Sequence, residues 1–175
     1  MASMHPPLEP LRLVLERLRQ GGVQAALGGS GLLFAHGLVE RVNDWDLTTD
    51  APPEQIRPAI LPLDWEDRTG GQDYATAGRF VIRQDGIEID VMSRFAIATE
   101  GGVCRLPTLV AGTWQGVECG SLEVWAAAYW LMGRTPKAER TLAHLRRHGA
   151  SPERLERILQ EPLPASLRVA LESLR

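Results

Sequence analysis

The sequence predicts an α+β protein in which a strand-rich part is followed by a helical region. Short apolar runs with strand-like alternation gather between about residues 22 and 119. After Ser121 the chain carries segments with helical spacing, each opened by Ser, Thr or Pro. We therefore expect a core over residues 1–119 and a helical extension over residues 120–175, packed together as one compact unit.

An amphipathic helix is predicted first, because apolar residues recur at i, i+3, i+4 and i+7 from Leu11 to Leu18. Gly21 and Gly22 end this helix. The elements predicted up to residue 60 are a helix over 9–20, a strand over 23–27, a helix over 31–38, a strand over 44–49 and a helix over 51–60.

Two longer strands are predicted next, separated by a turn around Asp85 and Gly86. The acids that precede them, such as Asp64 and Glu66, are expected in a loop. The remaining predicted elements are strands over 74–83 and 86–93, a less regular region over 95–119 that could contain a strand pair, and helices over 121–134, 135–149, 151–160 and 164–175.

Composition places the chain among ordinary globular proteins, with 175 residues, 44% hydrophobic and 23% charged. A formal charge of −3 gives no overall attraction to nucleic acid, so DNA is not an expected partner. The chain has no apolar run of transmembrane length and no signal-peptide pattern, so we expect no membrane partner and a cytoplasmic location. Cys104 and Cys119 lack disulfide-framework or metal-ligand spacing and are expected to be buried thiols.

Three acids on two predicted strands form the main candidate site. Because side chains alternate along a strand, Asp44 and Asp46 share one face, while Trp45 and Leu47 point to the other. Asp90 lies among isoleucines and valine on a later strand with the same alternation. If the two strands are neighbours, the three carboxylates converge, and such hard oxygen ligands suit Mg²⁺ or Mn²⁺. Taken singly, an Asp-x-Asp pair is common in exposed strands.

The Gly28-Gly29-Ser30 segment, placed between a strand and a helix, predicts a phosphate-binding turn. Glycines let backbone N–H groups approach an anion closely at a helix N-terminus, and the Ser30 hydroxyl can add a hydrogen bond. A Gly-Gly turn alone is usually only a turn. Its ordered combination with the acidic strands indicates a nucleotide-binding metal site.

At these residues the chain resembles the nucleotidyltransferase superfamily that includes DNA polymerase beta. The resemblance covers about residues 20–95. It implies a mixed β-sheet flanked by helices, two Mg²⁺ ions, and transfer of NMP from an NTP to an acceptor with loss of pyrophosphate. The positions that match the family's pattern are Gly28, Gly29, Ser30, Asp44, Asp46 and Asp90.

A finer likeness is to the head domain of the CCA-adding enzymes and poly(A) polymerases of bacteria, in which the acidic strand also runs into Thr and then Ala-x-Pro. The Val-Arg-Asp expected shortly after the glycines is replaced by residues 30–34, and no tRNA-binding body is expected after the helices. CCA addition is therefore not expected. The size is similar to small stand-alone transferases, which include antibiotic adenylyltransferases and toxins of toxin–antitoxin pairs.

The resemblance assigns roles to the three acids and to Lys137, and the place of Arg41 shortly before Asp44 suggests a further contact. Asp44, Asp46 and Asp90 would be catalytic residues and metal ligands, with Asp90 beside the acceptor hydroxyl. In several small relatives a helix after the core brings a lysine to the nucleotide, and Lys137 stands in a similar position. Arg41 could contact a phosphate. The alternatives are a solvated basic helix face for Lys137 and a surface arginine for Arg41.

The expected function is metal-dependent transfer of NMP from an NTP to a hydroxyl of an acceptor. The acceptor is open among a small molecule, a protein and an RNA end. The alternative is a non-catalytic nucleotide-binding module with a transferase-like fold. The presence of all three acids favours the enzyme.

Overall fold

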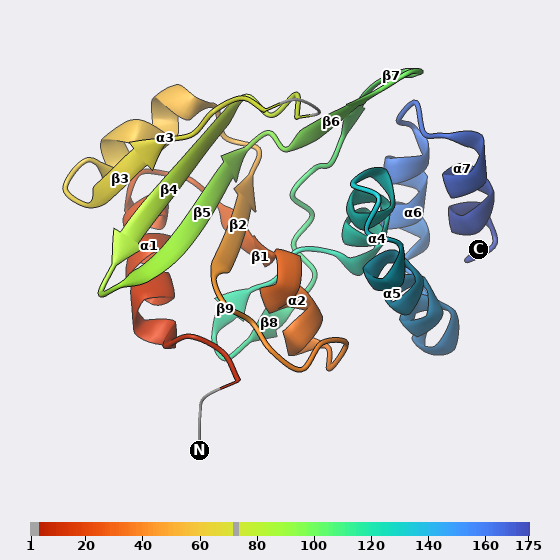
Figure 1. The fold of residues 1–175 in the computed structure, drawn as a ribbon, viewed down its shortest axis with the longest axis horizontal. Helices are drawn as coiled ribbons and strands as arrows, with labels where there is room; N and C mark the ends of the chain where they lie inside the picture. The colour runs from red at the N-terminus through yellow and green to blue at the C-terminus, as the bar shows by residue number, and fades with distance from the viewer. Residues whose placement is uncertain (1–3, 72–73) are drawn as a thin grey trace.

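The computed structural model describes residues 4–71 and 74–175. Within them a five-stranded mixed sheet has the strand order β1-β2-β5-β4-β3 (Figure 1). The β2 and β5 strands run parallel, and the other pairs are antiparallel. The strands of this sheet are β1 (Ala25–Gly28), β2 (Trp45–Thr49), β3 (Asp64–Asp67), β4 (Gly78–Gln84) and β5 (Ile87–Ser93).

One face of the sheet is the apolar core. Trp45 and Leu47 of β2 and Ile89 of β5 are fully buried, as the alternation of the sequence predicts. Helices α1 (Leu8–Gln20) and α3 (Pro53–Ile60) cover this face and contact each other. The acids of β2 and β5 therefore lie on the opposite face.

The turn between β4 and β5 has the conformation that its residues predict. Asp85 and Gly86 have φ of +53° and +76°, the left-handed region that suits a two-residue hairpin. This turn fixes the register of the two strands, in which Arg83 pairs with Glu88 and Val81 pairs with Asp90.

The expectation of a loop at residues 64–67 is wrong, because these residues form the edge strand β3. Asp64 and Glu66 are exposed on it, and Trp65 packs edge-on against Phe80 of β4. A single apolar residue among acids gives almost no periodic signal. Charged residues are nevertheless common on edge strands, where they discourage pairing with another chain.

The chain from residue 96 onward first forms two small hairpins and then helices. Ser121 caps α4 as predicted, since its side-chain oxygen accepts a hydrogen bond from the Val124 N–H. These elements are β6 (Ala96–Thr99), β7 (Gly102–Arg105), β8 (Thr113–Trp114), β9 (Val117–Glu118), α4 (Leu122–Leu131), α5 (Thr135–His148), α6 (Pro152–Leu159) and α7 (Ala165–Glu172).

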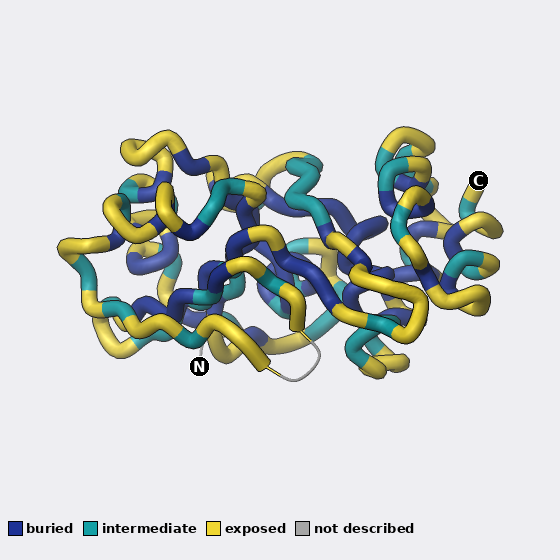
Figure 2. Tube along the Cα trace, turned by 90° about the horizontal axis from the view of Figure 1, so that it is seen from above, coloured by how far each residue is buried: buried dark blue, intermediate teal, exposed yellow. Residues whose placement is uncertain are grey.

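The helical region packs on the end of the sheet, at the right of Figure 1. Helix α4 is buried along nearly its whole length and contacts α2 (Gly29–Ala35), β6 and α5. Buried residues of the sheet and of the helices form a single cluster, and buried chain runs through the middle of the elongated molecule in Figure 2. The predicted α+β class is confirmed by this mixed sheet and its helices. Among the described residues, none of the helices is both long and apolar enough to cross a membrane.

Candidate active site

The glycine turn follows β1 directly, and α2 begins at Gly29, two residues earlier than predicted. Gly29 has a φ of +58°, which side chains other than glycine rarely adopt. A Cβ on Gly29 would overlap the Asp46 carboxylate, and a Cβ on Gly28 would overlap the Trp125 ring. Both glycines are therefore required by close approach of the backbone, on one side to β2 and on the other to α4.

The two acidic strands lie side by side, and their register brings two of the acids together. Asp46 is aligned with Asp90 across the parallel β2–β5 pair and with Gly28 across the antiparallel β1–β2 pair. Residues aligned across neighbouring strands project to the same face. Asp44 stands immediately before β2, and it is exposed.

Charge crowding is strongest at Asp46. Burial, followed by the negative charges of Asp90 and Asp44, raises the pKa of Asp46 to about 7, although Arg79 and Arg134 oppose the shift. The pKa of Asp44 is also raised, first by burial and then by Glu88 and Asp90. The negative charges of Asp44 and Asp46 are therefore not fully balanced by nearby positive charges.

Asp90 does have a cationic partner, Arg79 of β4. Arg79 Nε donates to Asp90 Oδ1 at 3.1 Å and to Oδ2 at 2.9 Å, and Nη2 donates to Oδ2 at 2.6 Å. This hydrogen bonding raises the pKa of Arg79. Arg79 was not predicted as a site residue, because the alternation of the strand gives its face but not the partner across the hairpin.

Helix α5 brings Lys137 to the glycine turn. Lys137 Nζ donates to Ser30 Oγ at 3.0 Å and lies 5.4 Å from the centre of the Tyr129 ring. Burial and then the neighbouring Arg134 lower the pKa of Lys137, whereas Asp46 acts in the opposite direction. Burial and then Asp46 raise the pKa of the Tyr129 hydroxyl.

These groups surround a cavity of about 170 Å³. Ser30, Asp46 and Asp90 line it together with two cations, Arg79 and Arg134. The apolar part of the lining comes from Tyr74, Met92, Phe95, Trp125, Tyr129 and Met132. Acids, cations and the Ser30 hydroxyl thus line one part of the cavity, and apolar, mainly aromatic side chains line another.

Several predicted site residues lie at the border of this cavity or beyond it. Lys137 contacts Ser30, which lines the cavity, and Gly28 directly precedes Gly29. Asp44 is near enough to Asp90 for the charge of Asp90 to help raise the pKa of Asp44. Arg41 is exposed in the segment between α2 and β2 and is not among the described residues that line the cavity.

The aromatic wall is the part of the site that sequence reasoning did not place there. Trp125 of α4 is both buried and part of the cavity lining. Its ring centre lies 5.5 Å from that of Phe95 and 5.6 Å from that of Tyr129. Nothing in the local spacing of these residues indicates that α4 packs against the glycine turn.

The donor set fits Mg²⁺ or Mn²⁺ by its chemistry. Carboxylate oxygens are the ligands these ions prefer. After burial, the nearby Asp90 and Asp44 are what raise the pKa of Asp46, and a divalent cation would compensate their crowded charges. In this structure the Asp90 carboxylate is paired with Arg79. Within residues 4–71 and 74–175, no group of three or more His, Cys, Asp or Glu side chains is arranged to hold a metal ion.

Compared by sequence, the chain matches no protein-family model and no curated protein. Its fold does match solved structures. One is TM1012 from Thermotoga maritima, named as a candidate nucleotidyltransferase, with 22% identity, a TM-score of 0.58, and coverage of 81% of this chain and 93% of that chain.

A second similar structure is the antibiotic-resistance factor ANT(2'')-Ia in solution. It shares 18% identity with a TM-score of 0.55, and the match covers 95% of this chain and 91% of that one. The crystal structure of ANT(2'')-Ia with adenylyl-2''-tobramycin has 17% identity, a TM-score of 0.52, and coverage of 93% and 95%. The chain therefore has the fold of a small nucleotidyltransferase.

Proposed function

We infer that the protein is a metal-dependent nucleotidyltransferase, which transfers NMP from an NTP to an acceptor hydroxyl and releases pyrophosphate. The observation that supports this most is the alignment of Asp46 with Asp90, opposite a glycine turn that Lys137 contacts. The similar solved structures support the same class of reaction. The cytoplasm, where NTPs are available, remains the predicted location.

The phosphates of the NTP are assigned to the glycine turn. Gly29 and Ser30 line the cavity, Ser30 offers a hydroxyl, and Lys137 and Arg134 supply positive charge beside it. Cations placed before the reaction begins stabilise the negative charge that moves toward the leaving pyrophosphate. Arg41 is left out of this assignment, because it lies away from the described lining of the cavity.

Asp44, Asp46 and Asp90 would hold two Mg²⁺ ions, or Mn²⁺, whose chemistry is charge neutralisation and alignment of the attacking and leaving oxygens. Asp90 stands on the β4 side of Asp46, next to Arg79. We assign the acceptor hydroxyl to this side, where an Asp90 carboxylate oxygen would accept its proton. The acceptor is a small molecule, a protein or an RNA end.

The test uses the four NTPs, each labelled at the α-phosphate, with the protein and Mg²⁺ in a cell extract. We expect one extract component to become labelled, together with release of pyrophosphate. Asp46→Asn and Asp90→Asn should each lower the rate by at least about 100-fold, because each removes a carboxylate from the metal site. Asp64→Asn is the matched control, since Asp64 is an exposed acid at the sheet edge.

Two results would contradict the proposal in different ways. Unchanged labelling by the Asp46→Asn protein would refute the assignment of the site. Binding of an NTP with Mg²⁺ in calorimetry, without release of pyrophosphate from any extract, would instead support a non-catalytic nucleotide-binding module.

A further inference from the structure

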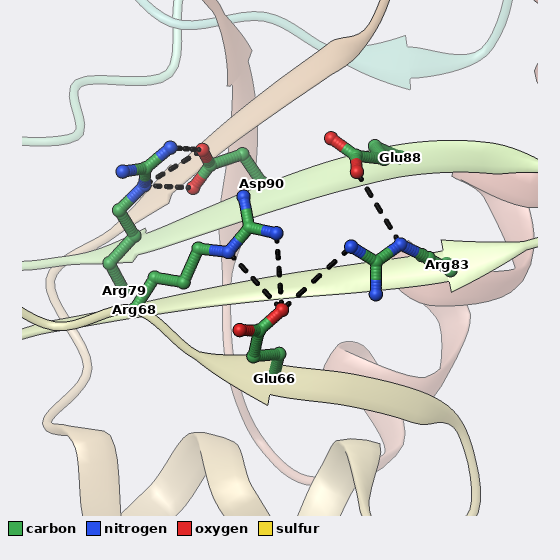
Figure 3. A network of polar contacts seen from close by, with 6 residues as sticks. All are labelled: Glu66, Arg68, Arg79, Arg83, Glu88 and Asp90. Atoms are coloured by element: carbon green, nitrogen blue, oxygen red, sulfur yellow. Dashed lines mark hydrogen bonds and ion pairs between the residues drawn. The ribbon is translucent and has the colours of Figure 1, made fainter.

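The ion pair between Arg79 and Asp90 stands inside the candidate active site (Figure 3). Both carboxylate oxygens of Asp90 accept hydrogen bonds from the guanidinium, at 2.6 to 3.1 Å. The Asp90 side chain is 16% exposed and that of Arg79 is 41% exposed, so the pair is shielded on the acid side only. A fork of two nitrogens on a carboxylate is the strong form of such a contact.

This contact conflicts with the role proposed for Asp90. A carboxylate that already accepts three hydrogen bonds from a guanidinium offers a divalent cation fewer free lone pairs. Arg79 also lies close enough to Asp46 to influence its charge, so the guanidinium provides positive charge to both aligned acids.

We propose that Arg79 is a positioning residue that holds Asp90 in the metal-free site, and that a divalent cation binds Asp90 only in exchange for it. The proposal rests on the proposed function, because that function requires a cation at Asp90. A guanidinium carries one charge and a Mg²⁺ or Mn²⁺ ion carries two, so the exchange favours the metal once other ligands assist it. Arg79 therefore weakens metal binding when no nucleotide is present.

The sheet provides a matched control on the same two strands. Arg83 of β4 contacts Glu88 of β5 with Nε 3.4 Å from Oε1, and both side chains are about equally exposed, at 46% and 41%. Arg83 also contacts Glu66, which binds Arg68 as well (Figure 3). Removing Arg83 deletes the same charge from the same strand without touching Asp90.

The experiment measures Mn²⁺ binding without nucleotide, by electron paramagnetic resonance of free Mn²⁺. Arg79→Ala should lower the dissociation constant of Mn²⁺ about three- to fivefold, which is the upper part of the range expected for loss of a partly exposed ion pair. The dissociation constant of Arg83→Ala should stay within about twofold of that of the wild type, because Arg83 does not contact Asp90 and salt screens its more distant charge. Circular dichroism of each variant checks that the fold is retained.

A double variant locates the effect at Asp90. Asp90→Asn removes the proposed partner of Arg79, so adding Arg79→Ala to it should tighten Mn²⁺ binding much less than in the wild type, because only the charge effect on Asp46 remains. The proposal is overturned if Arg79→Ala leaves Mn²⁺ affinity unchanged, if Arg83→Ala tightens it equally, or if the tightening persists in full in the Asp90→Asn background.

The labelling assay separates this proposal from the proposed function. If the Mn²⁺ affinities follow the expected pattern while no NTP is bound or consumed, the exchange at Asp90 stands and the transferase assignment fails. If the wild type transfers NMP while Arg79→Ala leaves Mn²⁺ affinity unchanged, the transferase assignment stands and the role of Arg79 is refuted.

Discussion

Asp46 links the stability of the protein to pH. Its pKa rises from the ordinary value of 3.8 to about 7 in the folded chain, so between these pH values the folded state holds a proton that the unfolded state has lost. The free energy of unfolding must then fall as pH rises from about 4 to about 7. This is the opposite of the usual behaviour of a salt-bridged carboxylate.

We predict that Asp46→Asn stabilises the metal-free protein at pH 8, because the amide cannot ionise. The gain should be about 2 kcal/mol, discounted for the partial exposure of the site, and should shrink toward pH 4. Urea unfolding in EDTA at several pH values measures it. Excess Mn²⁺ should stabilise the wild type more than the variant.

Asp64→Asn serves as the control, because this exposed acid lies at the sheet edge. The prediction fails if the free energy of unfolding of the wild type in EDTA rises between pH 5 and pH 8 and Asp46→Asn is no more stable than the wild type at pH 8. Asp46 would then not have a raised pKa.

Gly29 lies so close to Asp46 of β2 that an added Cβ would overlap the Asp46 carboxylate. We predict that Gly29→Ala lowers the free energy of unfolding by about 2–4 kcal/mol, since it adds overlap with the Asp46 carboxylate to the penalty of a positive φ. Chemical denaturation measures the loss. NTP binding should weaken too.

Gly37→Ala is the matched variant for Gly29→Ala. Gly37 has a φ of +72°, but an added Cβ there meets nothing within 4 Å. It should lose about 1 kcal/mol from backbone strain alone. Equal losses at the two positions would mean that the approach of Gly29 to Asp46 imposes no steric limit.

Helix α5 matters at the scale of elements, because it brings Lys137 to Ser30 across 107 positions of sequence. We predict that Lys137→Ala weakens NTP binding about tenfold with little change in stability, since one charge-assisted phosphate contact is lost. Calorimetric titration with each NTP measures this. Arg146 lies nine residues, or about two and a half turns, further along the same helix and so on its opposite face. Arg146→Ala should therefore bind NTP like the wild type.

If Lys137→Ala binds NTP as tightly as the wild type, the prediction is wrong and the alternative, a solvated basic helix face, applies to Lys137. A comparable loss in Arg146→Ala would indicate a general effect of charge on α5.

Local patterns predicted the elements that build the acidic half of the site. Alternation placed Trp45 and Leu47 in the core and the neighbouring acids on the other face, and the strands of Asp46 and Asp90 are indeed adjacent. The glycine turn was recognised from its residues, although its helix starts at Gly29, two residues earlier than predicted.

The remaining parts of the site depend on contacts between distant segments. The pairing of Arg79 with Asp90 follows from a hairpin register that alternation alone does not specify. The place of Trp125 follows from the packing of α4 on the glycine turn, and an all-round apolar helix gives no preferred face. Strand β3 was missed because its acids obscure one inward tryptophan.

At the scale of the whole molecule, the sheet and the helical region share one core. The Gly120 N–H donates to the Leu27 carbonyl at 2.9 Å, and the rings of Phe95 and Trp125 are in contact. The division of the chain at residues 119 and 120 remains a prediction about sequence regions, and the shared core argues against two independently folding units.

We therefore predict that a fragment of residues 1–119 does not fold cooperatively, because it would expose the apolar surfaces that α4 covers. Urea unfolding monitored by circular dichroism and binding of a hydrophobic dye would test this. The full chain should show one sharp transition and little dye binding. A fragment with its own sharp transition would establish residues 1–119 as an autonomous domain.

The β1–β2 register has a consequence for how the protein can change over time. Gly28 sits opposite Asp46 in the same hydrogen-bonded ladder that buries Trp45 and Leu47. A slip of one residue in this register would turn Asp46 inward and Trp45 outward. The position of the acid therefore cannot change without disrupting the core. Inherited variation should therefore accumulate on the rim of the cavity, and this ladder should tolerate almost none.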